Sequence, residues 1–408
     1  MDAPHLGPFS RHLARLCLSL TLAWASGLAL AGPSTPTAPL PQGADPGNVT
    51  ISGISSGAGM ALQYAIAHSA SVKGVATIAG PSWGCARGYV TQAINQCMCG
   101  VNRPLPDALP LAQSLAKSGD IDKPLASGRP QKLAAAFVFH SPLDATVVAS
   151  TGEASADFLQ RFIGTPPVVD RGHTTNDSDE AGHGILSPQG ADACRLAPAT
   201  DKTFVRRCGD EDNALDLFKA LYPAVTFDAT RRTDNVADAD LVPFDQKPFV
   251  DAVLQQGDYI APDGLLYYFY PTRSARRARL DMADQGLVYS PPACRVAGAR
   301  CGLHVALHGC KQDVKTFART TGYVHWAELY RVVVVFPAVN QGGSPVSESC
   351  AAGPVSSMAD YAWYQPNPNG CWDWWGYLDG TERTRYLTKR GPQMQVLERI
   401  VQHMTTSP

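Results

Sequence analysis

A serine flanked by glycines constrains the fold of this chain more than any other feature. Residues 53–57 read Gly-Ile-Ser-Ser-Gly and follow a short apolar run, residues 48–54, that is typical of a buried strand. A helix rich in Gly and Ala is predicted directly afterwards, over residues 57–68. In this context a G-x-S-x-G sequence indicates a nucleophile elbow, where the serine occupies a strained turn and its neighbours must be small. A glycine-rich turn at a sheet edge is the alternative, and the motif alone does not separate the two.

Further apolar runs of strand length extend the pattern, and predicted helices separate several of them. The predicted strands are residues 72–79, 133–140, 303–307 and 332–336, and the predicted helices are residues 149–162, 213–221, 326–331 and 393–404. Such strands suit a parallel sheet that helices cover on both faces. Residues 226–262 show no clear periodicity, and we expect an irregular excursion there. No linker or internal repeat divides the chain, so we expect one domain over residues 48–408.

Composition excludes several classes of partner. The chain has 408 residues, of which 45% are hydrophobic, so it can bury a large core. Its net charge is −2, and no sustained run of Lys or Arg occurs. These values predict no binding to nucleic acid or to an anionic membrane surface.

The N-terminus has the order of charge, apolar core and small residues that is typical of a signal peptide. Arg11 and Arg15 precede an apolar stretch, residues 16–30, which ends in Ala29-Leu30-Ala31. A buried helix or a membrane anchor is the alternative, but the stretch is short for a span and is interrupted by small polar residues. We expect a signal peptide over residues 1–31, a loose leader over residues 32–47, and no membrane span after cleavage.

Cysteine usage agrees with export. The chain has eleven cysteines, and Cys17 would leave with the signal peptide. The remaining ten are expected to pair as disulfides, and spacing favours local bridges from Cys194 to Cys208 and from Cys294 to Cys301. Zinc binding is the alternative, but Cys97-Met98-Cys99 lacks the two-residue gap of a zinc knuckle. We expect no metal site.

Candidate partners for the serine follow later in the chain. A serine hydroxyl needs a histidine to take its proton, and the histidine needs a carboxylate. Asp144 follows the strand predicted over residues 133–140, at the end where catalytic acids of such sheets lie. His183 lies between two glycines that leave its ring accessible, and His173 is its nearest competitor. Each of these residues could instead lie in an ordinary surface turn.

A serine esterase also needs backbone N–H donors for the oxyanion. The amide of Ser56 is one candidate. Residues 303–310 look like the strand and His-Gly loop of α/β-hydrolases, which makes the amide of Cys310 the second candidate. That strand ordinarily precedes the nucleophile, whereas here it follows Ser55 by most of the chain. We therefore predict a circularly permuted α/β-hydrolase with a mostly parallel central sheet.

Four segments carry a resemblance to a known family: residues 53–58, the segment from Cys194 to Cys208 behind His183, residues 303–312 and residues 369–377. They resemble extracellular poly(3-hydroxybutyrate) depolymerases, especially the single-domain, circularly permuted type, from about Asn48 to the C-terminus. The resemblance implies a triad of Ser55, Asp144 and His183, an oxyanion hole made by the amides of Ser56 and Cys310, and no metal or organic cofactor. One departure is Ser141, which stands where the family usually has glycine after the histidine.

An aromatic segment near the C-terminus offers candidate substrate contacts. Trp372, Trp374 and Trp375 could line a cleft for an apolar polyester chain, although core packing explains such residues equally well. Lys311 and Gln312 could support the oxyanion loop or could simply be solvated.

The leading hypothesis is a secreted, monomeric serine esterase that hydrolyses poly(3-hydroxybutyrate) or its oligomers through an acyl-enzyme on Ser55. We expect it to be extracellular, with the periplasm as the alternative. A carboxylesterase for other polyesters or for feruloyl and other aryl esters is the main rival function. A noncatalytic polymer-binding protein is a second rival. The triad alone does not distinguish the two esterases, because substrate choice depends on the cleft.

Overall fold

In a computed structural model, residues 37–408 form one compact unit. The structure describes residues 37–101, 104–123, 132–172, 181–195, 203–256, 280–341, 350, 367–379 and 382–407. The predicted signal peptide lies outside these residues. Within them, no helix is both long and apolar enough to cross a bilayer.

An eight-stranded sheet forms the centre of residues 37–408, in the order β4-β3-β2-β1-β10-β11-β9-β8. Its strands are β1 (Val49–Ile54), β2 (Val72–Ile78), β3 (Ala135–Phe139), β4 (Val168–Asp170), β8 (Leu241–Asp245), β9 (Gln285–Tyr289), β10 (Gly302–Leu307) and β11 (Val332–Phe336). The six strands from β4 to β11 in that order run parallel, and β9 is antiparallel to both of its neighbours. The five strands predicted from the sequence are confirmed.

The strand order also confirms the predicted permutation. β1, which leads into Ser55, pairs with β2 on one side and with β10 on the other, with Val49 opposite Leu303. β10 and β11 therefore lie beside the nucleophile strand although they follow it by most of the chain. The α/β-hydrolase sheet is complete, with its connection cut before β1.

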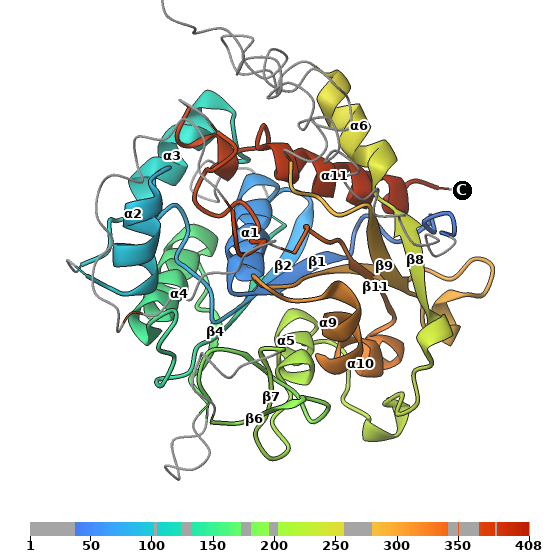
Figure 1. Cartoon of the computed structure of the whole chain (residues 1–408). Helices are drawn as coiled ribbons and strands as arrows, with labels where there is room; N and C mark the ends of the chain where they lie inside the picture. The colour runs from blue at the N-terminus through green and yellow to red at the C-terminus, as the bar shows by residue number, and fades with distance from the viewer. Residues whose placement is uncertain are drawn as a thin grey trace, which may run out of the picture. The chain divides into compact units, whose positions relative to one another are not determined.

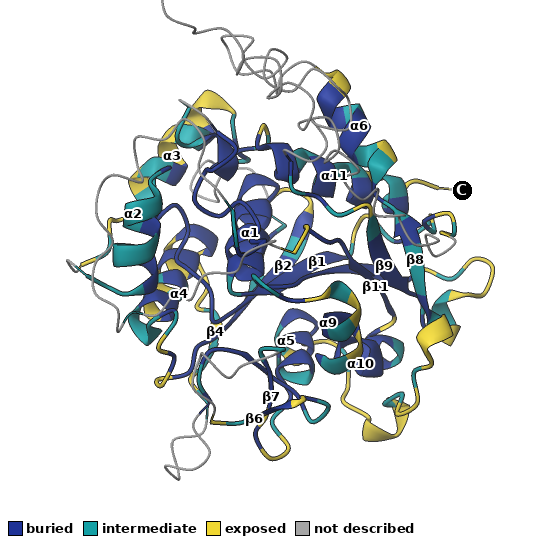
Figure 2. Ribbon diagram, in the orientation of Figure 1, coloured by how far each residue is buried: buried dark blue, intermediate teal, exposed yellow. Residues whose placement is uncertain are grey.

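Helices cover both faces of the sheet (Figures 1 and 2). One face packs against α1 (Ser56–Ala67), α3 (Leu109–Ser118), α4 (Ala149–Ile163), α6 (Lys247–Gln255) and α11 (Pro392–Thr405). The other face packs against α5 (Asn213–Leu221), α9 (Val314–Thr320) and α10 (Tyr323–Tyr330). Alternate strand residues enter the two cores: Ile51 and Val305 point to the first, and Ile54 and Ala306 to the second. Burial on both faces explains why these strands read as continuous apolar runs.

Two expectations from the sequence are wrong. Residues 226–262 were expected to be irregular, yet they contain β8 and α6. Pro243 argues against a central strand, so the sequence pattern did not indicate β8. Proline is tolerated here because β8 lies at the edge of the sheet. The leader over residues 32–47 was expected to be loose. Its described part is instead fixed by backbone hydrogen bonds from Gly43 to Thr406 and from Ala44 to Met404, and Leu40 is buried in the core.

Candidate active site

The turn after β1 holds Ser55 in a strained conformation. Ser55 has φ 54° and ψ −120°, a region that residues with a side chain rarely occupy, and α1 begins at the next residue. Gly57 is required beside it, because a Cβ at that position would lie 2.3 Å from the carbonyl oxygen of His308. The strand, the positive φ and the helix reproduce the geometry of a nucleophile elbow.

The loops after β1, β2 and β3 lie side by side at the carboxyl edge of the sheet. The Ser55 N–H donates to the carbonyl of Ile78, the Ala79 N–H to that of Phe139, and the His140 N–H to that of Asp170. Ser55 and the loop that contains Asp144 therefore share one edge, as expected for parallel strands.

Asp144 and His183 form a buried pair. Nδ1 of His183 lies 2.8 Å from Oδ2 of Asp144, and both residues are buried. The other carboxylate oxygen, Oδ1, accepts hydrogen bonds from the N–H groups of Thr146 and Val147. Burial by itself would raise the pKa of Asp144, but His183 and these donors outweigh burial and hold it below its usual value. Asp144 is thus an anion that can fix the His183 tautomer with its proton on Nδ1, leaving Nε2 as the acceptor. His173, the competitor, lies outside the described residues.

His140 contacts the Asp144 loop through its ring. Its Nε2 lies 2.6 Å from the carbonyl oxygen of Val147 and 3.5 Å from Oδ2 of Asp144. Burial lowers the pKa of His140, so its ring is neutral and donates from Nε2. The ring packs against Gly152, where a Cβ would lie 2.5 Å from Nδ1.

Ser141, at the position where the family usually has glycine, joins the two loops. Its hydroxyl donates to the carbonyl of Ala181, two residues before His183, and accepts the N–H of Leu143. The serine therefore adds a contact between the Asp144 loop and the His183 loop.

A buried arginine that the sequence analysis missed holds the backbone of His183. Arg206, on β7 (Val205–Arg207), is fully buried, and its Nε donates to the His183 carbonyl at 2.8 Å. Its Nη1 donates to the carbonyls of Ala193 and Cys194. The sequence does not show which of Arg206 and Arg207 is buried. In β7 successive side chains point to opposite sides, and Arg206 is the one that points inward.

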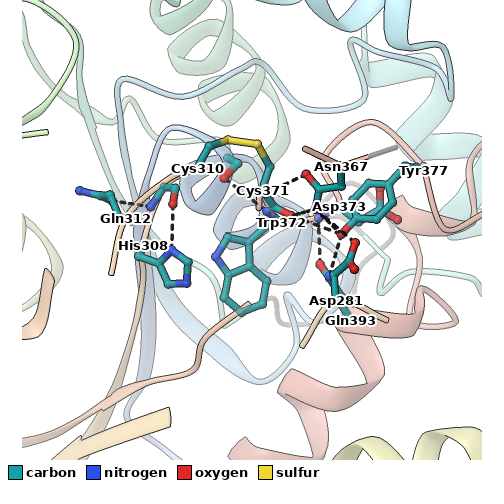
Figure 3. Close-up of a disulfide and its surroundings, with 12 residues drawn as sticks. Asp281, His308, Cys310, Gln312, Asn367, Cys371, Trp372, Asp373, Tyr377 and Gln393 are labelled. Carbon is teal, nitrogen blue, oxygen red and sulfur yellow. Dashed lines mark hydrogen bonds between the residues drawn. A yellow bond between two sulfur atoms is a disulfide. The ribbon is translucent and has the colours of Figure 1, made fainter. Parts of the chain in front are cut away.

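The His-Gly loop after β10 lies against the elbow. A Cβ on Gly309 would be 3.2 Å from the Cβ of Ser55, so the backbone of this loop reaches the serine. The next residue, Cys310, forms a disulfide with Cys371, which ties the loop to the aromatic segment (Figure 3). The Ser56 side chain is buried and accepts the N–H of Trp372. Gln312 is buried and bonded to Gly309, so the solvated interpretation is wrong for this residue.

The three candidate tryptophans are buried. Trp372 is 0% exposed and belongs to the main core, whereas Trp374 and Trp375 are 8% and 6% exposed and pack with Val147 and two disulfides in a smaller cluster. This burial favours core packing for Trp372. Within the described part of the chain, no group of three or more His, Cys, Asp or Glu side chains could hold a metal ion.

Two known proteins are similar to this chain over most of its length. No model of a known protein family matches the chain. A poly(3-hydroxybutyrate) depolymerase of Delftia acidovorans is 26% identical over 369 residues, which cover 89% of this chain and 60% of the relative. A polyhydroxybutyrate depolymerase of Talaromyces funiculosus is 24% identical over 88% of this chain and 91% of its own. The chain is similar to poly(3-hydroxybutyrate) depolymerases.

Solved structures of such depolymerases share the fold. The PHB depolymerase of Penicillium funiculosum and a PHB depolymerase in complex with an R3HB trimer both match with a TM-score of 0.64 and 23% identity. Each match covers 90% of this chain and 98% of the depolymerase. The chain spans 60% of the length of the Delftia depolymerase.

Proposed function

We propose that this protein is an exported serine esterase that hydrolyses the ester bonds of poly(3-hydroxybutyrate) or its oligomers. The observation that carries the proposal is the strained Ser55, with the His-Gly loop against it and a buried Asp144–His183 pair in the same half of the sheet. The similarity to depolymerases supports the substrate class.

In the proposed reaction Ser55 attacks the ester carbonyl while Nε2 of His183 takes its proton. Asp144 keeps the proton of the neutral ring on Nδ1 and stabilises the imidazolium that forms. The amides of Ser56 and Cys310 donate to the oxyanion of the tetrahedral intermediate. His183 then gives the proton to the leaving alkoxide, and the acyl group stays on Ser55. Water, activated by the same histidine, hydrolyses this acyl-enzyme.

Five disulfides support the proposed export, because structural disulfides persist in oxidising compartments. We propose an extracellular location, cleavage after Ala31 and action as a monomer. Sequencing the N-terminus of secreted protein and gel filtration test these points, and a mature start far from Gly32 would contradict the cleavage site.

The decisive experiment compares two neighbouring serines. Ser55→Ala removes the attacking oxygen and should abolish hydrolysis of p-nitrophenyl butyrate and amorphous poly(3-hydroxybutyrate). Ser56→Ala should keep substantial activity, because only its backbone amide is proposed to act. An inactive Ser56→Ala with an active Ser55→Ala would contradict the elbow assignment.

Product analysis then separates the candidate functions. Release of 3-hydroxybutyrate oligomers from the polymer supports the depolymerase. Turnover of p-nitrophenyl or feruloyl esters without polymer clearing would favour the other carboxylesterases. Folded protein that neither hydrolyses esters nor reacts with a fluorophosphonate would favour a noncatalytic binding protein.

A further inference from the structure

Both polar backbone atoms of Gly309 are held by buried side chains. Nδ1 of His308 lies 2.8 Å from the Gly309 carbonyl oxygen, and the Gly309 N–H donates to Oε1 of Gln312 at 2.5 Å. His308 is 1% exposed and Gln312 is 3% exposed. Figure 3 shows His308 and Gln312 near Cys310, with their hydrogen bonds as dashed lines.

The contacts of His308 assign its tautomer. The Val339 N–H can only donate, and it lies 3.2 Å from Nε2, which must therefore accept. The ring proton is on Nδ1, which donates to Gly309. Burial lowers the pKa of His308 to about 4, so this neutral tautomer persists at neutral pH.

Fixing the Gly309 carbonyl also fixes the Cys310 N–H. The two groups belong to one planar trans peptide and point in opposite directions. Within the described residues, no acceptor is found for the Cys310 N–H. The Cys310–Cys371 disulfide anchors the side chain of Cys310, but rotation about the bonds on either side of the peptide could still turn this N–H.

We propose that His308 and Gln312 are positioning residues that clamp Gly309 and thereby aim the Cys310 N–H at the oxyanion. This inference rests on the proposed function. In this proposal the two residues act through the orientation of one peptide group.

Gln312 extends the clamp to the segment that precedes β7. Its Nε2 donates to the carbonyl of Thr203 at 2.6 Å, and the next residue, Phe204, packs edge-on against the ring of His183 with centroids 6.0 Å apart. One side chain therefore bridges the loop with the proposed oxyanion donor and the segment that contacts the proposed base.

The test uses kcat, KM and the inhibition constant of butaneboronic acid, which forms a tetrahedral adduct on a nucleophilic serine. Removal of an oxyanion donor costs about 10²–10³ in kcat, so a misdirected donor should cost roughly 10–100-fold. We expect Gln312→Leu and His308→Leu to lower kcat for p-nitrophenyl butyrate by that factor, with little change in KM. The boronate inhibition constant should rise by the same factor, because it reports the tetrahedral state.

A conservative variant should restore activity. His308→Asn keeps an N–H donor near the position of Nδ1 and should recover most of the lost kcat. His304→Leu is the matched control, because His304 is also buried, on β10, but bonds to Thr50 and Ser52 and not to the loop. It should lower stability and leave kcat per folded molecule unchanged.

The outcomes separate the two levels of inference. Wild-type protein that fails to hydrolyse the ester would overturn the proposed function and the clamp with it. An active wild type whose folded Leu variants keep kcat and boronate inhibition unchanged would overturn the clamp alone. If the Leu variants do not fold, the boronate adduct of the wild type decides: the Cys310 nitrogen should lie about 2.7–3.1 Å from a boronate oxygen. A Cys310 N–H directed away from that oxygen would overturn the proposal.

Discussion

Asp144 shows how this site uses burial at the residue scale. A carboxylate with no charged or hydrogen-bonding partner would be expensive to bury, yet here two backbone N–H groups and His183 compensate for lost water. Arg206 applies the same principle with opposite charge, since carbonyl oxygens surround its buried guanidinium. The proposed acid and base are therefore held by groups that cannot relax into solvent.

Replacing Asp144 by Asn should keep the shape of the loop but remove the anion. The amide favours the wrong His183 tautomer, so we expect turnover to fall by about 10⁴, by analogy with dissected serine triads. Steady-state kinetics on p-nitrophenyl butyrate measures the loss. Asp107→Asn, which breaks an exposed pair with Arg161, is the control and should retain full activity. A fall of less than tenfold for Asp144→Asn would argue against its role.

At the scale of elements, a buried polar network joins the nucleophile strand to β10. Nδ1 and Nε2 of His304 lie 2.8 Å from the hydroxyls of Thr50 and Ser52, which in turn bond to Tyr222 and Tyr323. Both ring nitrogens are satisfied, so the network links β1 and β10 to the helical layer of α5 and α10 without an unpaired group on the histidine. Burial lowers the pKa of His304 to about 3.

This network predicts a pH-dependent stability. An unfolded histidine binds a proton near pH 6.5, whereas folded His304 binds one only near pH 3. Between these values the unfolded state holds more protons, so the contribution is present above pH 6.5 and is lost as the pH falls toward 3. The slope from one such group approaches about 1.4 kcal/mol per pH unit. We expect the free energy of unfolding, measured in urea between pH 4 and 7, to depend less steeply on pH in His304→Leu than in the wild type. The difference in slope should correspond to about one bound proton. An unchanged slope would contradict the assignment.

In the aromatic segment, the burial of Trp372 predicts a role in stability. Trp372 is fully buried in the main core, so Trp372→Ala should lower the free energy of unfolding by about 3–5 kcal/mol. Polymer clearing and short-ester hydrolysis should then fall together, in proportion to lost folded protein. Thermal denaturation and the two assays measure this, and a selective loss of polymer clearing would place Trp372 in substrate binding.

The sequence predicted those elements whose burial matches a simple pattern. β1, β2, β3, β10 and β11 are central strands with continuous apolar runs, and all five were predicted. β8 and β9 at the far edge mix polar residues with Pro243 and Gly286, and neither was predicted. In the proposed site, Ser55 was selected by its motif, Asp144 by its place after a predicted strand and His183 by its flanking glycines. Arg206 and the roles of His308 and Gln312 depend on which backbone groups their side chains reach, and this follows only from tertiary contacts.

At the scale of the whole molecule, disulfides concentrate where regular structure is sparse. All ten cysteines after Cys17 pair, including the two local bridges favoured by spacing. The other bridges join Cys85 to Cys97, Cys99 to Cys350 and Cys310 to Cys371. The first and third of these bridges belong to the small cluster of Trp374 and Val147, and Cys99 packs against it, so covalent bonds reinforce this cluster beside the Asp144 loop.

We expect mature, secreted protein to contain no free thiol. Intact-mass measurement after alkylation without reductant should show no adduct, and alkylation after reduction and denaturation should show ten. Alkylation of several cysteines before reduction would contradict the fully paired structure.

Because β1 pairs with β10, the edge of β1 can be covered only after β10 has been synthesised. A chain made from its N-terminus presents Ser55, Asp144 and His183 early, but one edge of β1 stays bare until residues 302–307 have been made. Through that interval the strand that carries the proposed nucleophile is an open template for pairing with other chains. The segment that begins with β10 thus closes the exposed edge and also brings the Cys310 amide, so protection from aggregation and assembly of the proposed site arrive in one step.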